Sequence, residues 1–136
     1  MPKLTCEATV HAPVSEVYEK FTDPAHVTNW YHARDDWHAP SASNDLRVGG
    51  EFAIRMEPRD GSAGGFDFTG TYTAVQPERH LAYALADDRV VHIDFAESGG
   101  VTTVTETFDA EDENAGKQQR EGWQAILDNF KKYCER

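Results

Sequence analysis

The chain has 136 residues, of which 39% are apolar and 27% charged, with 24 acidic against 13 basic side chains and a formal net charge of −11. A chain of this length buries roughly two-thirds of the surface that its unfolded form exposes, so we expect one domain over residues 1–136 that needs no metal or disulfide. The acidic balance disfavours nucleic-acid and membrane partners, and no apolar run resembles a membrane span or secretory leader, so we expect a cytoplasmic protein.

The N-terminal segment predicts a strand followed by short helices. Over residues 4–10 apolar and polar side chains alternate, as in a strand with one buried face. Residues 13–23 have apolar side chains at helical spacing, and Pro24 ends that helix because the residue before proline avoids the α region. A second short helix is expected over residues 24–29, followed by an aromatic-rich loop over residues 30–40.

The middle of the chain predicts successive antiparallel strands. Period-two alternation runs from residue 44 to residue 108, interrupted by glycine-rich turns. Connections this short join neighbouring strands in antiparallel pairs. Gly70 lies on the apolar face, which indicates a bend or the close approach of a neighbouring group. The other inward-facing residues are Phe52, Ile54, Met56, Phe66, Phe68, Tyr72, Tyr83, Leu85, Val91, Ile93, Phe95 and Phe108.

Residues 114–133 predict a long amphipathic helix. Trp123, Leu127 and Phe130 lie on one apolar stripe of that helix, at 3.6-residue spacing. A sheet with one apolar face needs a cover, and this stripe matches it. We therefore predict an α+β fold in which a curved antiparallel sheet of about six to seven strands wraps around the C-terminal helix, with two short helices after the first strand.

Four segments, in this order, resemble a known family: APVSEVYEKFTDPAHVTNWY, DLRVGGEF, FTGTYTAVQPERHLAYA and EGWQAILDNFKKYCE. The chain is similar to the START-like, birch-pollen-allergen-like (SRPBCC) superfamily, in the branch named after the activator of the 90-kDa heat-shock protein ATPase. It departs from the family pattern at Trp30-Tyr31, where two tryptophans are common, and at Phe130, where leucine is usual. The resemblance implies a helix-grip fold with a cavity between sheet and helix that holds an apolar molecule.

Binding of a small hydrophobic or aromatic molecule in that cavity is the leading functional hypothesis, with no cofactor. The same side chains could instead close-pack the core, since an apolar face does not distinguish a filled interior from a hollow one. Trp30 and Trp37 are placed at the lip of the pocket. The expected ligand-binding residues are Trp30, Trp37, Phe52, Ile54, Met56, Phe66, Phe68, Tyr72, Tyr83, Ile93, Glu106, Trp123, Leu127 and Phe130.

Glu106 is the one candidate for catalysis. Alternation through Val104, Glu106 and Phe108 puts its carboxylate on the apolar face, where burial raises a pKa toward the range of a general acid or base. A register error would instead turn Glu106 to solvent. A cyclase- or hydrolase-like enzyme is the runner-up function, and it is not our prediction, because no serine or cysteine has the partners of a nucleophile.

The loop over residues 30–40 contains His32, Asp35, Asp36 and His38. Two imidazoles and two carboxylates can bind a metal, but this spacing fits no standard site, and we predict no metal centre.

Other chemically distinctive side chains are assigned structural roles. Arg47 is expected either to bond to loop carbonyls or to pair with Asp45, and His92 is expected to face solvent beside a neighbouring strand. Cys6 and Cys134 fit no zinc or redox motif, so two free thiols are expected, at least one of them buried.

Two kinds of protein partner complete the hypotheses. Modulation of a chaperone ATPase, which the family name suggests, is the weakest, because this sequence shows no preceding chaperone-binding domain. Open sheet edges could pair into a homodimer, although no feature of the sequence requires it.

Overall fold

The computed structural model describes residues 3–61, 64–85, 88–109 and 113–135, with the backbone alone for 113–119. The elements follow the order that the sequence predicts: a strand, two short helices, a run of strands and a long helix. Their bounds are β1 (Lys3–Val10), α1 (Val14–Thr22), α2 (Pro24–Val27), β2 (Trp37–Asn44), β3 (Glu51–Pro58), β4 (Phe66–Gln76), β5 (His80–Ala84), β6 (Val90–Ser98), β7 (Val101–Asp109) and α3 (Glu113–Cys134).

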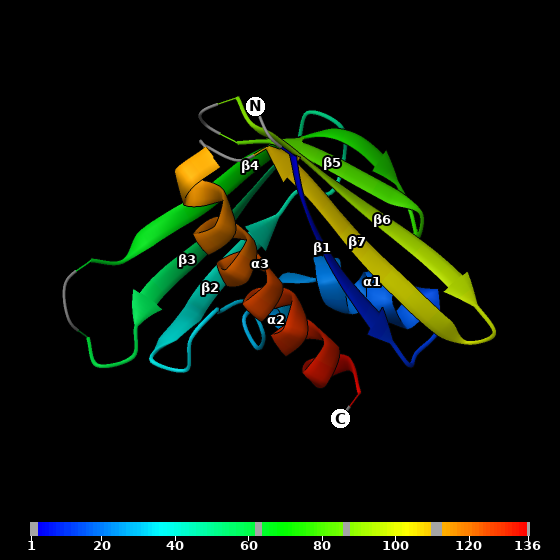
Figure 1. The fold of residues 1–136 in the computed structure, drawn as a ribbon, viewed down its shortest axis with the longest axis horizontal. Helices are drawn as coiled ribbons and strands as arrows, with labels where there is room; N and C mark the ends of the chain where they lie inside the picture. Colours follow the sequence, from blue (N-terminus) through cyan, green and yellow to red (C-terminus); the bar gives the residue numbers. More distant parts are fainter. Residues whose placement is uncertain (1–2, 62–63, 86–87, 110–112, 136) are drawn as a thin grey trace.

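The strands form a single antiparallel sheet in the order β1-β7-β6-β5-β4-β3-β2. The sheet curls into a half-barrel, and α3 runs diagonally across it, with α1 and α2 near the C-terminal end of α3 (Figure 1). This is the predicted helix-grip arrangement: the long helix covers the apolar face of the sheet.

The strand β2 corrects the prediction of a loop over residues 30–40. It begins at Trp37 and pairs with β3, with a register shift between His38 and Ser41. Its sequence, WHAPSASN, shows no apolar alternation because β2 is an edge strand, and edge strands tolerate proline and irregular pairing.

The inward register of the sheet is confirmed at most of the predicted positions. On β7, Val104, Glu106 and Phe108 are buried, at 0%, 7% and 1% exposure. Phe66 is the exception, with 51% of its surface exposed, because it begins β4 and packs against the ring of Trp37 at its margin.

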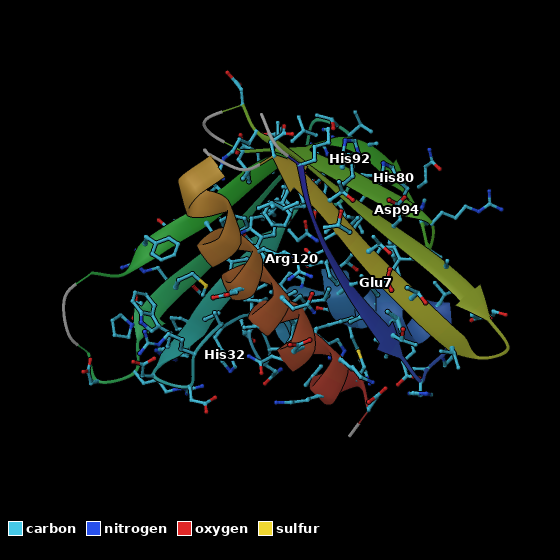
Figure 2. The ribbon with its side chains drawn as sticks, viewed as in Figure 1. Glu7, His32, His80, His92, Asp94 and Arg120 are labelled. Carbon is cyan, nitrogen blue, oxygen red and sulfur yellow. The ribbon has the colours of Figure 1, made fainter. Side chains whose placement is uncertain are left out.

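Side chains of α3 cover the free edge of β1. Arg120 donates to the Thr5 carbonyl at 3.1 Å, and Gln124 both donates to the Glu7 carbonyl and accepts from the Glu7 N–H. Further along, the Glu135 carboxylate accepts the N–H of His11 at 2.9 Å. Figure 2 shows Glu7 on β1 beside Arg120 on α3. Backbone groups that an edge strand would leave unpaired are therefore bonded to the helix that crosses it.

The predicted structural roles of Arg47 and the cysteines are confirmed. The Arg47 guanidinium donates to both carboxylate oxygens of Asp45, at 3.0 and 2.9 Å. Cys6 and Cys134 are free and buried, and burial raises the pKa of each thiol to about 11. Within the described residues, no helix combines the length and apolar character that a bilayer span requires.

Candidate functional site

A cavity lies between the inner face of β2, β3, β4, β5 and β7, the segment that contains α1 and α2, and one residue of α3. Its volume is about 50 Å³, measured as the space open to the centre of a water molecule. One water needs roughly 10–15 Å³ on this measure, so the cavity takes a few waters or a small organic molecule. It is smaller than the several hundred Å³ that the ligand-binding hypothesis anticipates.

Close approach at Gly70 shapes one wall of the cavity. Gly70 pairs with Phe52 across β3 and β4, and a Cβ on Gly70 would lie 2.5 Å from the Phe52 ring and 3.2 Å from Tyr83. The missing side chain lets the Phe52 ring lie flat over the backbone and meet Tyr83 edge to face, with ring centroids 4.8 Å apart. The sequence prediction of close approach at Gly70 is confirmed.

A short hydrogen-bond chain closes another wall. The Tyr72 hydroxyl donates to the Asn44 side-chain oxygen at 2.7 Å, and the Asn44 amide donates to the Thr22 carbonyl at 2.7 Å. The chain ties β4 to β2 and to the end of α1, so these polar groups of the lining are bonded to one another.

Glu106 lines the cavity from β7, and 7% of its surface is exposed. Among the described residues, none forms a hydrogen bond with its carboxyl group. Burial in this apolar setting raises the pKa of Glu106 to about 8, because loss of water disfavours the charged form. The prediction of an inward carboxyl group is confirmed, and at neutral pH the neutral acid predominates.

Two tyrosines line the cavity close to Glu106. Tyr83 comes from β5, and Tyr31 follows α2 with its ring stacked on Phe68 at 5.9 Å. Burial, together with the charge that Glu106 carries when ionised, raises the pKa of both hydroxyls well above its ordinary value. Neither hydroxyl hydrogen-bonds within the part of the chain that the structure describes.

The predicted ligand-binding residues divide into two groups. One group lines this cavity: Trp30, Phe52, Ile54, Phe68, Tyr72, Tyr83 and Glu106. The others do not line it: Trp37, Met56, Phe66, Ile93, Trp123, Leu127 and Phe130. Trp37 lies in β2 against Phe66 and does not form the lip of this cavity, whereas Trp30 is 2% exposed and belongs to the wall.

Sequence reasoning missed part of the lining. Tyr31 and Asn44 carry its unassigned polar groups, and the remaining missed residues are Phe21, Thr22, Pro24, Val27, Ala42, Ser43, Leu81 and Ile126. A signal existed for Phe21 and Ile126, which lie on apolar helical stripes, and for Leu81, which alternates with Tyr83. The β2 residues carried none, since that strand has no apolar alternation.

Next to the cavity, aromatic rings close-pack around Phe130. The Phe130 ring is fully buried and meets Trp30 at 4.7 Å and Phe21 at 5.2 Å, both edge to face. Two turns earlier on the same stripe of α3, Trp123 stacks on Phe108 at 4.2 Å. For these residues the sequence analysis allowed either a packed core or a ligand site, and the contacts show a packed core.

The histidines His80 and His92 lie on the outer face of the sheet and do not line the cavity. His92 lies on the outer face of the sheet, as predicted, and stacks on His80, whose ring bonds to Asp94 at 2.8 Å. Figure 2 shows these three residues together over β5 and β6, away from α3.

The four loop residues His32, Asp35, Asp36 and His38 are not brought within metal-ligating distance of one another in the described structure. The group that does converge in those ranges is Glu19, Asp23 and His26, with ligand atoms within 4.8 Å of one another. Its two carboxylates are exposed, and we assign it no metal.

Comparison with known proteins places this geometry in a family. The profile of the family described as "Activator of Hsp90 ATPase homolog 1-like protein" matches residues 11–135. No protein with a curated description matches the chain.

Solved structures agree with the family match. The solution structure of the AHSA1-like protein from Aeromonas hydrophila is 44% identical, with a TM-score of 0.91 over 97% of this chain and 91% of that one. A protein of Cytophaga hutchinsonii is 42% identical, with a TM-score of 0.82 over 96% and 90%. CalU16 from Micromonospora echinospora, at 23% identity and a TM-score of 0.72 over 97% and 75%, shares the fold.

Proposed function

Because the chain belongs to the family of Activator of Hsp90 ATPase homolog 1-like proteins, whose helix-grip fold it shares, we propose that it binds a small hydrophobic or aromatic molecule between the sheet and α3. The observation that carries the proposal is the cavity itself, walled mostly by aromatic and aliphatic side chains. Binding sites for small molecules are concave and mostly apolar, with few polar groups.

The small volume of the cavity limits the ligand. A ring compound enters only if a wall side chain moves, and Ile126 and Tyr31 are among the wall residues that are only half-buried. The proposed ligand is therefore compact, of the size of a single ring.

Filling the cavity tests the proposal. Ala42 lines it from β2, and Ala53, on the neighbouring strand, faces the outside of the sheet. Ala42→Phe is expected to abolish binding of a small apolar ring such as toluene, followed by NMR titration, whereas Ala53→Phe leaves binding intact. Ala42→Leu serves as a milder filling variant if the larger ring prevents folding.

Native mass spectrometry gives a second test, by comparing the freshly purified protein with its denatured mass. An excess mass lost on unfolding identifies a retained ligand and gives its mass.

Toluene binding that Ala42→Phe and Ala42→Leu leave unchanged would show that the cavity is not the binding site.

A second candidate function, general acid or base catalysis, rests on the raised pKa of Glu106 at about 8, near the pH at which such a group works best. Turnover of a ligand identified by mass spectrometry should then disappear in Glu106→Gln while binding remains. Turnover that persists in that variant removes Glu106 from the chemistry.

A further inference from the structure

The polar groups of the cavity are of two kinds. Tyr72 and Asn44 bond to each other and to the backbone, so their hydrogen-bonding capacity is used inside the protein. Glu106, Tyr31 and Tyr83 also line the cavity, yet within the described ranges their oxygens have no hydrogen-bond partner. Fully buried polar groups are almost always bonded, and Tyr18 is the described residue whose fully enclosed side-chain oxygen is unbonded. The unbonded oxygens of Glu106, Tyr31 and Tyr83 are instead open to the cavity, so a molecule inside it can bond to them.

These three polar groups come from three separate elements and line the same cavity. Glu106 is on β7, Tyr83 on β5 and Tyr31 in the segment after α2, and the first two are 7% and 6% exposed. Each tyrosine hydroxyl lies close enough to Glu106 to be affected by the charge of the carboxylate, and Tyr83 is affected by Tyr31 as well. Glu106, Tyr31 and Tyr83 therefore form the part of the lining whose polar groups are unbonded, which we call the polar corner.

Resting on the function proposed above, we propose that the Glu106 carboxyl and the Tyr31 and Tyr83 hydroxyls form a donor subsite that binds the carbonyl oxygen of a small, uncharged ketone. The rest of the ketone packs against the apolar wall made by Phe52, Ile54 and Leu81.

The donor character of the corner favours a carbonyl oxygen. A neutral carboxyl group has one O–H donor, and a tyrosine hydroxyl has another. A carbonyl oxygen offers two lone pairs and no proton, so it accepts from two of these donors without leaving a donor of its own unpaired. Since the pKa of Glu106 is raised to about 8, its donor form prevails at neutral pH.

Charged ligands fit the corner less well. An ammonium group would need the ionised carboxylate, and the pair would have to leave water for an apolar cavity, at a cost that attraction repays only in excellent geometry. A ligand carboxylate would face the same loss of water. A ligand without any polar atom would leave all three polar groups unbonded.

Three ring compounds of similar shape test the subsite: cyclohexanone, methylenecyclohexane and cyclohexylamine. Their affinities are measured by NMR titration at pH 7, and the carbonyl carbon shift of bound cyclohexanone reports hydrogen bonding directly. Glu106→Leu and Tyr83→Phe are expected to weaken cyclohexanone about 10-fold and to leave methylenecyclohexane within about 2-fold. Glu106→Gln, which keeps an N–H donor and the shape of the side chain, retains most of the ketone affinity.

Tyr18→Phe is the matched control. It removes a buried tyrosine hydroxyl from α1, outside the cavity, and should change neither affinity.

The dependence of cyclohexanone affinity on pH is a further test, because it would not change if Glu106 only packed against the ligand. The titratable groups around Glu106 are Cys6 on β1, Tyr83 on β5, Tyr72 on β4 and Tyr31. The pKa values of all four groups are raised further above neutrality. From α3, the apolar Ile126 faces the cavity. Cyclohexanone affinity should therefore fall as pH rises through about 8 in the wild-type protein and stay flat in Glu106→Gln.

The possible results are distinct. Variants that weaken the ketone and the alkene equally overturn the donor subsite and leave the proposed binding function standing. Tighter binding of cyclohexylamine than of cyclohexanone by the wild-type protein also overturns the subsite, in favour of an ionised Glu106. Failure of all three compounds to bind rejects the proposed function and the subsite together.

Discussion

The aromatic cluster around Phe130 and the cavity around Glu106 are neighbours under the same helix, and both are rich in aromatic rings. Around Phe130, the rings of Phe21 and Trp30 interlock edge to face from α1 and the segment after α2. Around Glu106, the walls come from strands, from the segment that contains α1 and α2, and from Ile126 of α3, and three polar groups of this lining have no hydrogen bonds in the described residues. The comparison shows that the content of apolar side chains alone does not decide whether a region is close-packed or contains a cavity. Apolar rings pack closely against one another, whereas unbonded hydroxyl and carboxyl groups disfavour such close packing.

The largest effect is expected from the charge of Glu106. Its pKa is about 8 in the folded protein against 4.5 when exposed, so the folded state holds a proton that the unfolded state releases between these values. The stabilisation by this proton is complete below pH 4.5 and is lost as pH rises to 8. Glu106→Gln, which does not titrate, should therefore become more stable relative to the wild-type protein by about 5 kcal/mol over this range.

Urea unfolding of both proteins at several pH values measures this difference. Other titrating groups cancel, because they are common to the two proteins. A constant stability difference from pH 4.5 to 9 would contradict the burial of an unpartnered carboxyl group.

Truncation of Phe130 probes the filled region. Phe130→Ala removes a fully buried ring from between Trp30 and Phe21 and should lower the free energy of unfolding by about 4 kcal/mol. Phe66→Ala, which removes a ring that is 51% exposed, should cost about 1 kcal/mol or less. Similar losses in the two variants would mean that the Phe130 cluster is no better packed than the margin of the sheet.

A smaller effect is expected where the cavity wall is built. Gly70→Ala places a methyl group against the Phe52 ring, which must shift toward the cavity, and should destabilise the protein by about 2 kcal/mol. Gly122 lies in α3 with nothing within 4 Å of an added Cβ, so Gly122→Ala should stabilise the protein by about 0.5–1 kcal/mol. Thermal unfolding of both variants shows whether the signs differ, and a neutral Gly70→Ala would disprove the close approach at Phe52.

The sequence predicted the fold well because its signal is local. Alternation along β3 to β7 and the stripe on α3 specify which faces are buried, and Glu106 was placed on the inner face by its neighbours Val104 and Phe108. The family resemblance, now confirmed, supplied the same architecture independently.

The site was predicted only in part because a cavity depends on contacts between distant residues. Tyr31 adjoins Glu106 only after α2 and β7 come together, and neither segment of sequence reports that distance. Leu127 and Ile126 are adjacent on α3, yet Leu127 is buried in the core and Ile126 faces the cavity. Both residues lie on the apolar stripe, and an amphipathic pattern does not report which residues of a stripe face a cavity.

The bonds between α3 and the edge of β1 have a consequence for how the protein is made. Arg120 and its acceptor on Thr5 are 115 residues apart, and Gln124 and Glu7 are 117 residues apart. At the usual 5–20 residues per second of protein synthesis, β1 therefore leaves the ribosome several seconds before the helix that covers its edge. During that interval its open backbone can pair with strands of other nascent chains. Docking of α3 therefore ends a period in which β1 is open to such pairing, and the same helix adds Ile126 to the cavity wall.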